Sequence, residues 1–346
     1  MHTTSTTRRH AGLVLRTGIM ALALVAAAAL VPVPTDHGHP GPGDTPPIAL
    51  GAYVQPAPVP GDPNAAIAAL DASLGRHLAI YQTFTDWVTS TGAPTPFPVD
   101  FARYVAGLGA TPMITWQPQA PPVPGVPDAD QPEFSLAQIE SGRYDAYIRS
   151  WADQAKTFPG VVYVRLMHEM NGAWYPWGAG VNGNTPAQYV SAWQHVVALV
   201  GDEGATNLRF VWCASSSARL DPTPFYPGDG SVSWIALDGY NKGATWKTFT
   251  QAVTPCYDEI TALSSLPVMI AETASVESPT DPGAKAAWIT SAFGVEIPQT
   301  FPRVRVALYF DAPSGPARQA LTSSPQALQA FVQVAASPLY QGPPPS

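Results

Sequence analysis

The sequence predicts a (β/α)8 TIM barrel that forms one domain over residues 48–340. Three observations predict this class. Apolar runs alternate with segments of helical spacing eight times over roughly 290 residues, which is the pattern of the fold. Polar and aromatic residues follow the runs at their C-terminal ends, where barrels carry their sites. The alternative is a doubly wound open sheet, but no glycine-rich phosphate turn follows any of the runs.

The predicted strands are short and almost continuously apolar. They cover residues 49–55, 77–84, 111–118, 161–169, 208–215, 233–241, 267–275 and 305–313. Strands of a parallel sheet are covered on both faces, so they lack the alternation of apolar and polar residues that half-exposed strands show.

The segments between the strands place apolar residues three and four apart, which is the spacing of one helix face. Helices are predicted for residues 64–74, 99–108, 136–158, 189–200, 249–263, 284–293 and 325–334. Several starts show a capping residue followed by proline, as in Thr185-Pro186 and Ser324-Pro325. Residues 216–232, after the fifth strand, have weak helical spacing and are predicted to form a loop with a short turn.

The N-terminus has the composition of an export signal. Arg8, Arg9 and Arg16 precede an apolar run that ends at Val31 and is too short for a comfortable membrane span. Residues 1–31 are therefore predicted to be a signal peptide, with an uncleaved signal anchor as the alternative. Residues 32–47, rich in Pro and Gly, are predicted to be a disordered spacer, and residues 341–346 a tail. We expect a secreted protein, or one held at the membrane by its signal.

Composition excludes several functional classes. The 346-residue chain is 46% hydrophobic and has a net charge of −8, with scattered Lys and Arg, which argues against nucleic acid and anionic membrane surfaces. No closely spaced Cys/His pair indicates a metal site. Cys213 and Cys256 fit either one disulfide or two free thiols. Nothing in the sequence implies a protein partner, and we expect a monomer.

The most informative segment follows the fourth predicted strand and reads R-L-M-H-E-M-N-G-A-W-Y-P-W from Arg165. Glu169, at the end of an apolar strand, is not explained by core packing. A buried carboxylate must be paired or functional, because an unpaired one costs several kcal/mol or takes up a proton. The nearby Trp174 and Trp177 offer flat apolar faces with a polar edge, which suit sugar rings.

Glu272 is a second lone acid that ends an apolar strand, the seventh. Strands four and seven lie on opposite sides of a narrow barrel, so Glu169 and Glu272 are expected to project into one cleft. Hydrolysis of a glycosidic bond needs such a pair of carboxyl groups, one as proton donor and one as nucleophile or base. A gap of about 5–5.5 Å between them implies attack and retention of configuration.

Three blocks resemble glycoside hydrolase family 26: the R-x-x-H-E-M-N-G-x-W-Y-P-W block, W-I-A-L-D-G-Y-N at residues 234–241 and P-V-M-I-A-E-T-A-S at residues 267–275. The resemblance extends over residues 49–335. It implies a (β/α)8 fold and a secreted enzyme that needs no cofactor. The best-known members are endo-β-1,4-mannanases, and others cut mixed-linkage β-glucan or β-1,3-xylan.

The resemblance also implies residue roles. Glu169 would be the acid/base and Glu272 the nucleophile. His168 and Arg165 would shape the charge around them, Tyr240 would hydrogen-bond the nucleophile, and Trp174 would line the site. Further expected substrate-binding or supporting residues are Trp177, Trp116, Gln117, Asp238, Trp212 and Tyr309.

Three of these residues bear on the substrate. Trp116 and Gln117 resemble the third-strand segment of glucanase-like members, which often carry Glu where Gln117 stands. Tyr309 lies on the eighth strand, where mannanase members usually present a tryptophan as a sugar platform. Asp238 and Trp212 each have an alternative reading, as a fold-supporting acceptor and as core packing.

The sequence therefore predicts a retaining endo-β-glycanase, with mannan as the first substrate and mixed-linkage β-glucan as the alternative. A different class is a carbohydrate-binding protein of the cell envelope that no longer cleaves. A third possibility is an enzyme that acts on the envelope polysaccharide of the producing cell.

Overall fold

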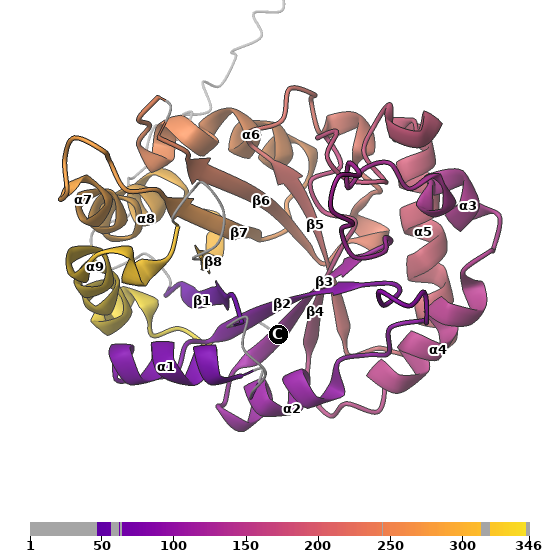
Figure 1. The fold of residues 1–346 in the computed structure, drawn as a ribbon, viewed down its shortest axis with the longest axis horizontal. Helices are drawn as coiled ribbons and strands as arrows, with labels where there is room; N and C mark the ends of the chain where they lie inside the picture. Colours follow the sequence, from indigo (N-terminus) through magenta and orange to yellow (C-terminus); the bar gives the residue numbers. More distant parts are fainter. Residues whose placement is uncertain (1–46, 57–61, 63, 244, 313–318, 344–346) are drawn as a thin grey trace, which may run out of the picture. The chain divides into compact units, whose positions relative to one another are not determined.

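Eight parallel strands close into a barrel in sequence order, with the first strand paired to the last. In Figure 1 the strands lie at the centre and the helices surround them. The strands are β1 (Ala49–Val54), β2 (Ile80–Asp86), β3 (Thr111–Gln117), β4 (Val162–Leu166), β5 (Leu208–Ser215), β6 (Trp234–Asn241), β7 (Val268–Ser275) and β8 (Val304–Asp311). The predicted (β/α)8 class is confirmed.

The computed structural model describes residues 47–56, 62, 64–243, 245–312 and 319–343. The predicted signal, nearly all of the predicted spacer and the last three residues of the tail lie outside these residues. Within the described part of the chain, no helix has the length and apolar character needed to cross a membrane.

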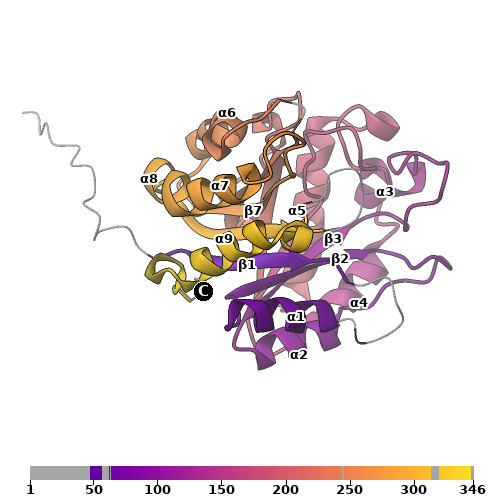
Figure 2. The same cartoon turned by 60° about the vertical axis from the view of Figure 1, so that its left-hand side comes forward.

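The helices follow the strands in alternation. They are α1 (Ala65–Leu74), α2 (Val99–Gly107), α3 (Leu136–Glu140), α4 (Asp145–Ala155), α5 (Pro186–Asp202), α6 (Phe249–Leu263), α7 (Ala284–Ser291), α8 (Ile297–Thr300) and α9 (Pro325–Ala336). A π-helical segment, Ala292–Glu296, joins α7 to α8. Helices α9 and α1 contact each other, as Figures 1 and 2 show, so the last helix closes the ring beside the first.

Local signals explain where the helices begin. Thr185 caps α5 and Thr248 caps α6, each through a capping box in which a Gln side chain returns the hydrogen bond. Ser324 accepts from the Ala327 amide at the start of α9. These caps satisfy amide groups that have no partner inside the helix.

Three predicted elements differ from the observed ones. The helix predicted for residues 136–158 is two helices, because Gly142 adopts a φ of +82° between α3 and α4. The loop predicted for residues 216–232 holds two 3-10 turns, Thr223–Phe225 and Asp229–Ser231. Strand β4 ends at Leu166 rather than Glu169, and the chain turns sharply there.

Strand residues divide between the barrel interior and the layer under the helices. The interior holds a small cluster that includes Met113, Tyr163 and Met269. The outer layer is larger and richer in aromatic rings. Each large side chain that is fully buried contributes about 1.5–3 kcal/mol to folding. The barrel wall is thus stabilised mainly from outside, which leaves the C-terminal mouth of the interior free for polar groups.

Candidate active site

The turn after β4 carries the first acid. Met167 and Glu169 have left-handed backbone angles, with φ of +43° and +53°, and such angles cost a non-glycine residue about 1–3 kcal/mol each. The surroundings hold the turn in place. The Glu169 amide donates to the Cys213 carbonyl at 2.8 Å, and the Tyr189 hydroxyl donates to the Met167 carbonyl at 3.0 Å. Strain of this kind gathers at functional sites, where the fold imposes a side-chain direction.

A bulge in β7 aims the second acid. Leu237 pairs with Ile270, but the next residue of β6, Asp238, pairs with Glu272 and skips Ala271. Ile270 packs under the helices, so strict alternation would send Glu272 the same way. The extra residue reverses this, and Glu272 faces the interior. This bulge was not predicted from the sequence.

Arg165 is the central cation of the site and is fully buried. Its Nη1 donates to Asp238 Oδ2 at 2.7 Å, its Nη2 donates to Glu272 Oε1, and its Nε donates to Thr115 Oγ1 at 2.9 Å. Charge-assisted hydrogen bonds of this type are about twice as strong as neutral ones. Arg165 therefore fixes the carboxylate of β7 relative to that of β6.

Glu272 accepts from donors on three strands. Besides Arg165, the Gln82 amide donates to Oε1 at 3.1 Å and the Tyr240 hydroxyl donates to Oε2. Burial and then the charge of Glu272 raise the pKa of Tyr240 well above its usual value, so Tyr240 keeps its proton and remains a donor. Tyr240 lies where the resemblance predicts it, whereas Gln82 was missed.

Asp238 supports the site through its hydrogen bonds with Arg165 and Cys213. It is fully buried, and its second oxygen, Oδ1, accepts from the Cys213 thiol at 3.2 Å. With both oxygens occupied by Cys213 and Arg165, the structure supports the fold-supporting reading of Asp238 rather than contact with substrate. Cys213 and Cys256 are both free thiols, so the disulfide alternative is wrong.

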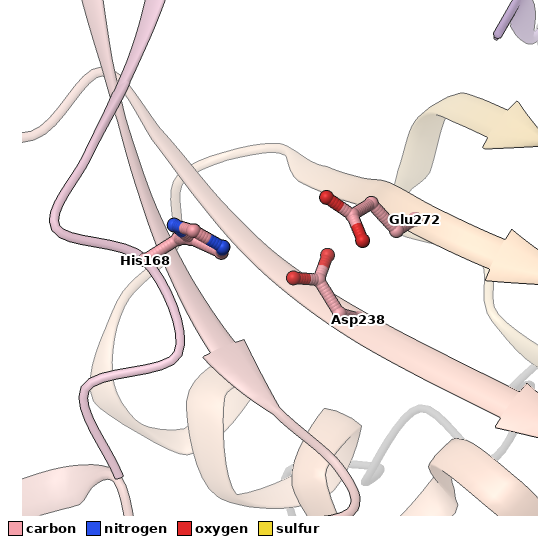
Figure 3. Close-up of side chains that lie close together, drawn as sticks. All are labelled: His168, Asp238 and Glu272. Carbon is pink, nitrogen blue, oxygen red and sulfur yellow. The ribbon is translucent and has the colours of Figure 1, made fainter. Parts of the chain in front are cut away.

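His168, Asp238 and Glu272 converge, as Figure 3 shows, and each offers an atom within 4.8 Å of the others. Such a trio resembles a metal site among the described residues. However, Arg165 donates to both carboxylates. The guanidinium already supplies the cation that would balance their charge, so these residues do not fit a metal ion.

Glu169 is partly buried, and its Oε2 accepts from Trp174 Nε1 at 2.7 Å. Burial and the negative charge of Glu272 raise the pKa of Glu169, while hydrogen bonds from Ser215 and Trp174 and the charge of Arg165 lower it. The net shift is upward. The two acids thus interact electrostatically and lie in different settings, Glu169 beside an indole and Glu272 on a guanidinium.

His168 supports the β4 turn. Its Nε2 lies 3.0 Å from the Tyr175 hydroxyl, and its carbonyl accepts from Trp177 Nε1 at 2.7 Å. Burial and the nearby Arg165 charge hold the pKa of His168 well below its usual value, so the ring is neutral. Trp177 is fully buried and stacks on Tyr175, with ring centroids 4.6 Å apart. Trp177 therefore braces the loop, so of the two expected roles, substrate binding and support, the structure favours support.

An aromatic wall lines the β8–β1–β2 side of the site. Tyr53 lies 4.8 Å from Phe310 and 4.9 Å from Phe84, measured between ring centroids. Phe310 also meets the edge of Tyr240 at 5.8 Å. Burial and the charge of Glu272 raise the pKa of Tyr53 to about 12. We refer to Tyr53, Phe84 and Phe310 as the aromatic wall.

Strand geometry corrects the substrate-binding expectation for Trp116 and Tyr309, and it favours core packing, the alternative left open, for Trp212. Trp116 stacks on Trp151 at 4.2 Å, Trp212 packs against Tyr226, and Tyr309 donates to the Gln319 carbonyl. Trp116, Trp212 and Tyr309 are fully buried in the layer under the helices, where substrate has no access. On β8 the inward residue is Phe310, the next along the chain, because successive side chains face opposite ways.

Other residues lie at the mouth. Gln117 is buried at the inward end of β3, opposite Asp86 of β2. Trp174 is 40% exposed on the β4 loop, and Trp246 is 39% exposed in the loop between β6 and α6. Trp246 was not among the predicted site residues. Its position after the end of a strand was the signal that could have assigned it to the mouth.

The chain resembles known proteins in sequence. Residues 130–292 match the profile described as Glycosyl hydrolase family 26. The chain is 31% identical to Endoglucanase H of Acetivibrio thermocellus over 295 residues, which cover 82% of this chain and 30% of that protein. It is 29% identical to a mannan endo-1,4-beta-mannosidase of Bacillus subtilis over 188 residues, 52% of this chain and 48% of that protein. The chain thus spans less than half the length of these curated relatives.

Solved structures show the same fold. A GH26 β-mannanase from Bacteroides ovatus superposes with a TM-score of 0.61 and 16% identity, covering 85% of this chain and 89% of that one. The catalytic domain of a Bacillus sp. GH26 endo-β-1,4-mannanase gives a TM-score of 0.64 and 18% identity, covering 85% and 86%. These structures share the fold of this chain, and the sequence matches place the chain in glycosyl hydrolase family 26.

Proposed function

We propose that this chain is a retaining endo-β-glycanase that cleaves a mannan-type β-1,4-linked polysaccharide with Glu169 and Glu272. The observation that carries the proposal is the pairing of two carboxyl groups in unlike environments at one end of the barrel. Glycosidases need one carboxyl group that holds a proton and one that is available as an anion.

Glu169 acts as the proton donor. Its raised pKa keeps a share of it protonated at pH values where an exposed glutamate is ionised. Its proton passes to the departing glycosidic oxygen, and Glu169 then takes a proton from the water that releases the sugar. Once Glu272 carries the sugar, its negative charge is gone, so the pKa of Glu169 falls and Glu169 becomes a base.

Glu272 acts as the nucleophile. Arg165 and Tyr240 hold its two oxygens and leave the carboxylate little freedom to rotate. A fixed carboxylate facing the sugar carbon lowers the entropic cost of attack. Asp238 and His168 act indirectly, Asp238 by orienting Arg165 and neutral His168 by supporting the β4 turn.

Exposed aromatic rings support a sugar polymer as substrate. Trp174 and Trp246 lie on the loops that follow β4 and β6, two strands separated by β5. Large exposed indoles on strand-following loops commonly bind a ligand. We propose that they flank the scissile bond and hold the chain along the mouth of the barrel.

A β-glucan is the second candidate substrate. The match to Endoglucanase H extends over 82% of this chain, against 52% for the mannosidase from Bacillus subtilis. In addition, the inward residue at the end of β8 is Phe310 rather than a tryptophan. Both observations support β-glucan as a candidate substrate beside mannan.

A substrate panel tests the proposal. Purified chain is incubated with mannan, glucomannan, lichenan and xylan, and the products are sized. Release of oligosaccharides from mannan and glucomannan is the expected result, and Glu272→Ala should lose roughly 10⁴-fold or more of this activity. Glu169→Ala should retain turnover of substrates with good leaving groups and regain rate with azide.

Other outcomes distinguish the alternatives. Cleavage of lichenan alone would replace mannan by β-glucan. Binding to a glycan without cleavage of any would support a carbohydrate-binding protein of the cell envelope. Full activity of Glu272→Ala would remove the proposed mechanism.

We also propose that the chain is exported through its N-terminal signal. The support is the sequence of residues 1–31, with arginines ahead of an apolar run. N-terminal sequencing of protein recovered from culture medium tests this. Recovery in the membrane fraction with residue 1 intact would favour the anchor.

A further inference from the structure

Gln82 is a polar residue inside the barrel that was not among the predicted site residues. Its amide Nε2 donates to Glu272 Oε1 at 3.1 Å and to Thr115 Oγ1 at 3.0 Å. The side chain is 2% exposed, so bulk water does not compete for these contacts. Rotating the amide by half a turn would place its carbonyl oxygen against the carboxylate. The donor therefore faces Glu272.

The other end of the same amide has no partner. Gln82 Oε1 is buried and accepts no hydrogen bond from any described group. Buried acceptors are normally satisfied, and the exceptions need an explanation. Here the explanation is the orientation of the amide. The orientation in which its N–H donates to Glu272 leaves its carbonyl oxygen without a hydrogen bond.

The two oxygens of Glu272 are held differently. Oε1 accepts from both Arg165 and Gln82, whereas Oε2 accepts from Tyr240. Two donors occupy the lone pairs of Oε1 more fully. Oε2 is therefore the better placed atom for bonding to the sugar, and Oε1 becomes the carbonyl oxygen of the resulting ester.

We propose that Gln82 is a positioning residue that accelerates the second chemical step, the release of the sugar from Glu272. This inference rests on the proposed function. In the first step Oε2 bonds to the sugar carbon while the glycosidic bond breaks, and the departing oxygen takes the proton of Glu169. In the second step water attacks that carbon and gives its proton to Glu169. The bond to Oε2 breaks, and its electron pair returns to the carboxylate.

The effect of Gln82 differs between the steps because the charge on Oε1 changes in opposite directions. A donor binds an anionic oxygen more strongly than an ester carbonyl. During the second step negative charge grows on Oε1, so the Gln82 hydrogen bond strengthens toward the transition state. In the first step the charge declines and the same bond weakens. Only interactions that strengthen toward the transition state raise a rate.

The test compares wild type with Gln82→Met, which has a similar shape and no donor. The substrate is a dinitrophenyl β-glycoside of the disaccharide that the panel identifies, because its good leaving group makes the second step rate-limiting. We expect kcat to fall about tenfold to a hundredfold, the effect of losing a hydrogen bond to a charged group. KM should fall with kcat, and kcat/KM should change much less. An equal loss in kcat and kcat/KM, or no loss in either, would overturn the inference.

Gln119 provides a matched control. It is also buried, its Nε2 donates to Asp86 at 2.9 Å, and its Oε1 has no described partner. It has no hydrogen bond to Glu272. Gln119→Met should leave both kcat and KM as in wild type. If it reproduces the split, the effect of Gln82→Met is structural and the inference fails.

A second variant covers the case in which Gln82→Met does not fold. Gln82→Glu keeps the shape and places a second carboxyl group beside Glu272. Because two neighbouring carboxyl groups resist double ionisation, the acidic limb of kcat/KM should move to higher pH. An unmoved limb would contradict contact between the two side chains. Glu272→Ala separates the hypotheses, since its full activity would sink the proposed function itself, whatever Gln82 does.

Discussion

Arg165 and Lys285 are both completely buried cations, but they lie in contrasting settings. Arg165, inside the barrel, donates to two carboxylates. Lys285, on α7, donates to the Ala320 carbonyl at 2.6 Å and the Ser323 hydroxyl at 2.8 Å, while Glu277 lies 4.0 Å away. Arg165 is thus paired with carboxylates at close range. The two hydrogen bonds of Lys285 named above go to uncharged oxygens.

The difference teaches what each charge does. A guanidinium keeps its proton in proteins, so Arg165 can hold Glu272 at any working pH. Burial lowers the pKa of Lys285 to about 8, against the raising effect of Glu277 and Asp311. Lys285 fastens the segment after β8 to α7 and is able to lose its charge. The buried cation inside the barrel thus stays charged, whereas the buried cation outside it is sensitive to pH.

The largest expected contrast comes from removing each cation. Arg165→Met leaves two carboxylates buried without their partner, which costs about 3–5 kcal/mol of folding free energy. It should also abolish glycan cleavage. Lys285→Met removes the hydrogen bonds to the Ala320 carbonyl and the Ser323 hydroxyl, which costs about 1–3 kcal/mol, and activity should persist. Urea unfolding and the panel assay measure both. Equal losses in the two variants would break the contrast.

The second expected effect is a pH dependence from Lys285. Its pKa is about 8 in the folded chain, below the ordinary 10.5. Between these values the unfolded chain binds the extra proton, so the free energy of unfolding contributed by Lys285 rises with pH. Below pH 8 both states are protonated and the burial penalty is complete. From pH 7 to 10 wild type should gain on the order of 2 kcal/mol relative to Lys285→Met. Parallel stability curves for the two proteins would refute this.

The smallest expected effect concerns Glu169. The Trp174 hydrogen bond lowers the pKa of this acid, so Trp174→Phe should raise it further. Because Glu169 is the proposed proton donor of the first step, the basic limb of kcat/KM should move to higher pH. Trp246→Phe is the control, as that indole has no contact with Glu169 and should leave the limb unmoved. A downward shift in Trp174→Phe would contradict the assigned contact.

Strand positions and the pair of acids could be predicted because they depend on local patterns. Apolar runs located the eight strands to within a few residues, and a lone acid at the end of a predicted strand made Glu169 and Glu272 the candidates. The structure brings both together with Arg165 and Tyr240, as the family resemblance implies.

Side-chain directions could not be predicted as well. Trp116, Trp212 and Tyr309 end strands in sequence, but alternation turns them under the helices. The bulge beside Glu272 depends on pairing with β6, and pairing register is not visible in one strand. Gln82 was missed because its proposed role depends on a hydrogen bond to Glu272, which lies 190 residues away in sequence.

Trapping the covalent intermediate tests the central claim most directly. Wild type is incubated with an activated 2-deoxy-2-fluoro glycoside of the identified substrate, digested, and analysed by mass spectrometry of its peptides. We expect the sugar on the peptide that contains Glu272. A label on Glu169, or an active enzyme that is never labelled and releases the inverted anomer, would contradict the account.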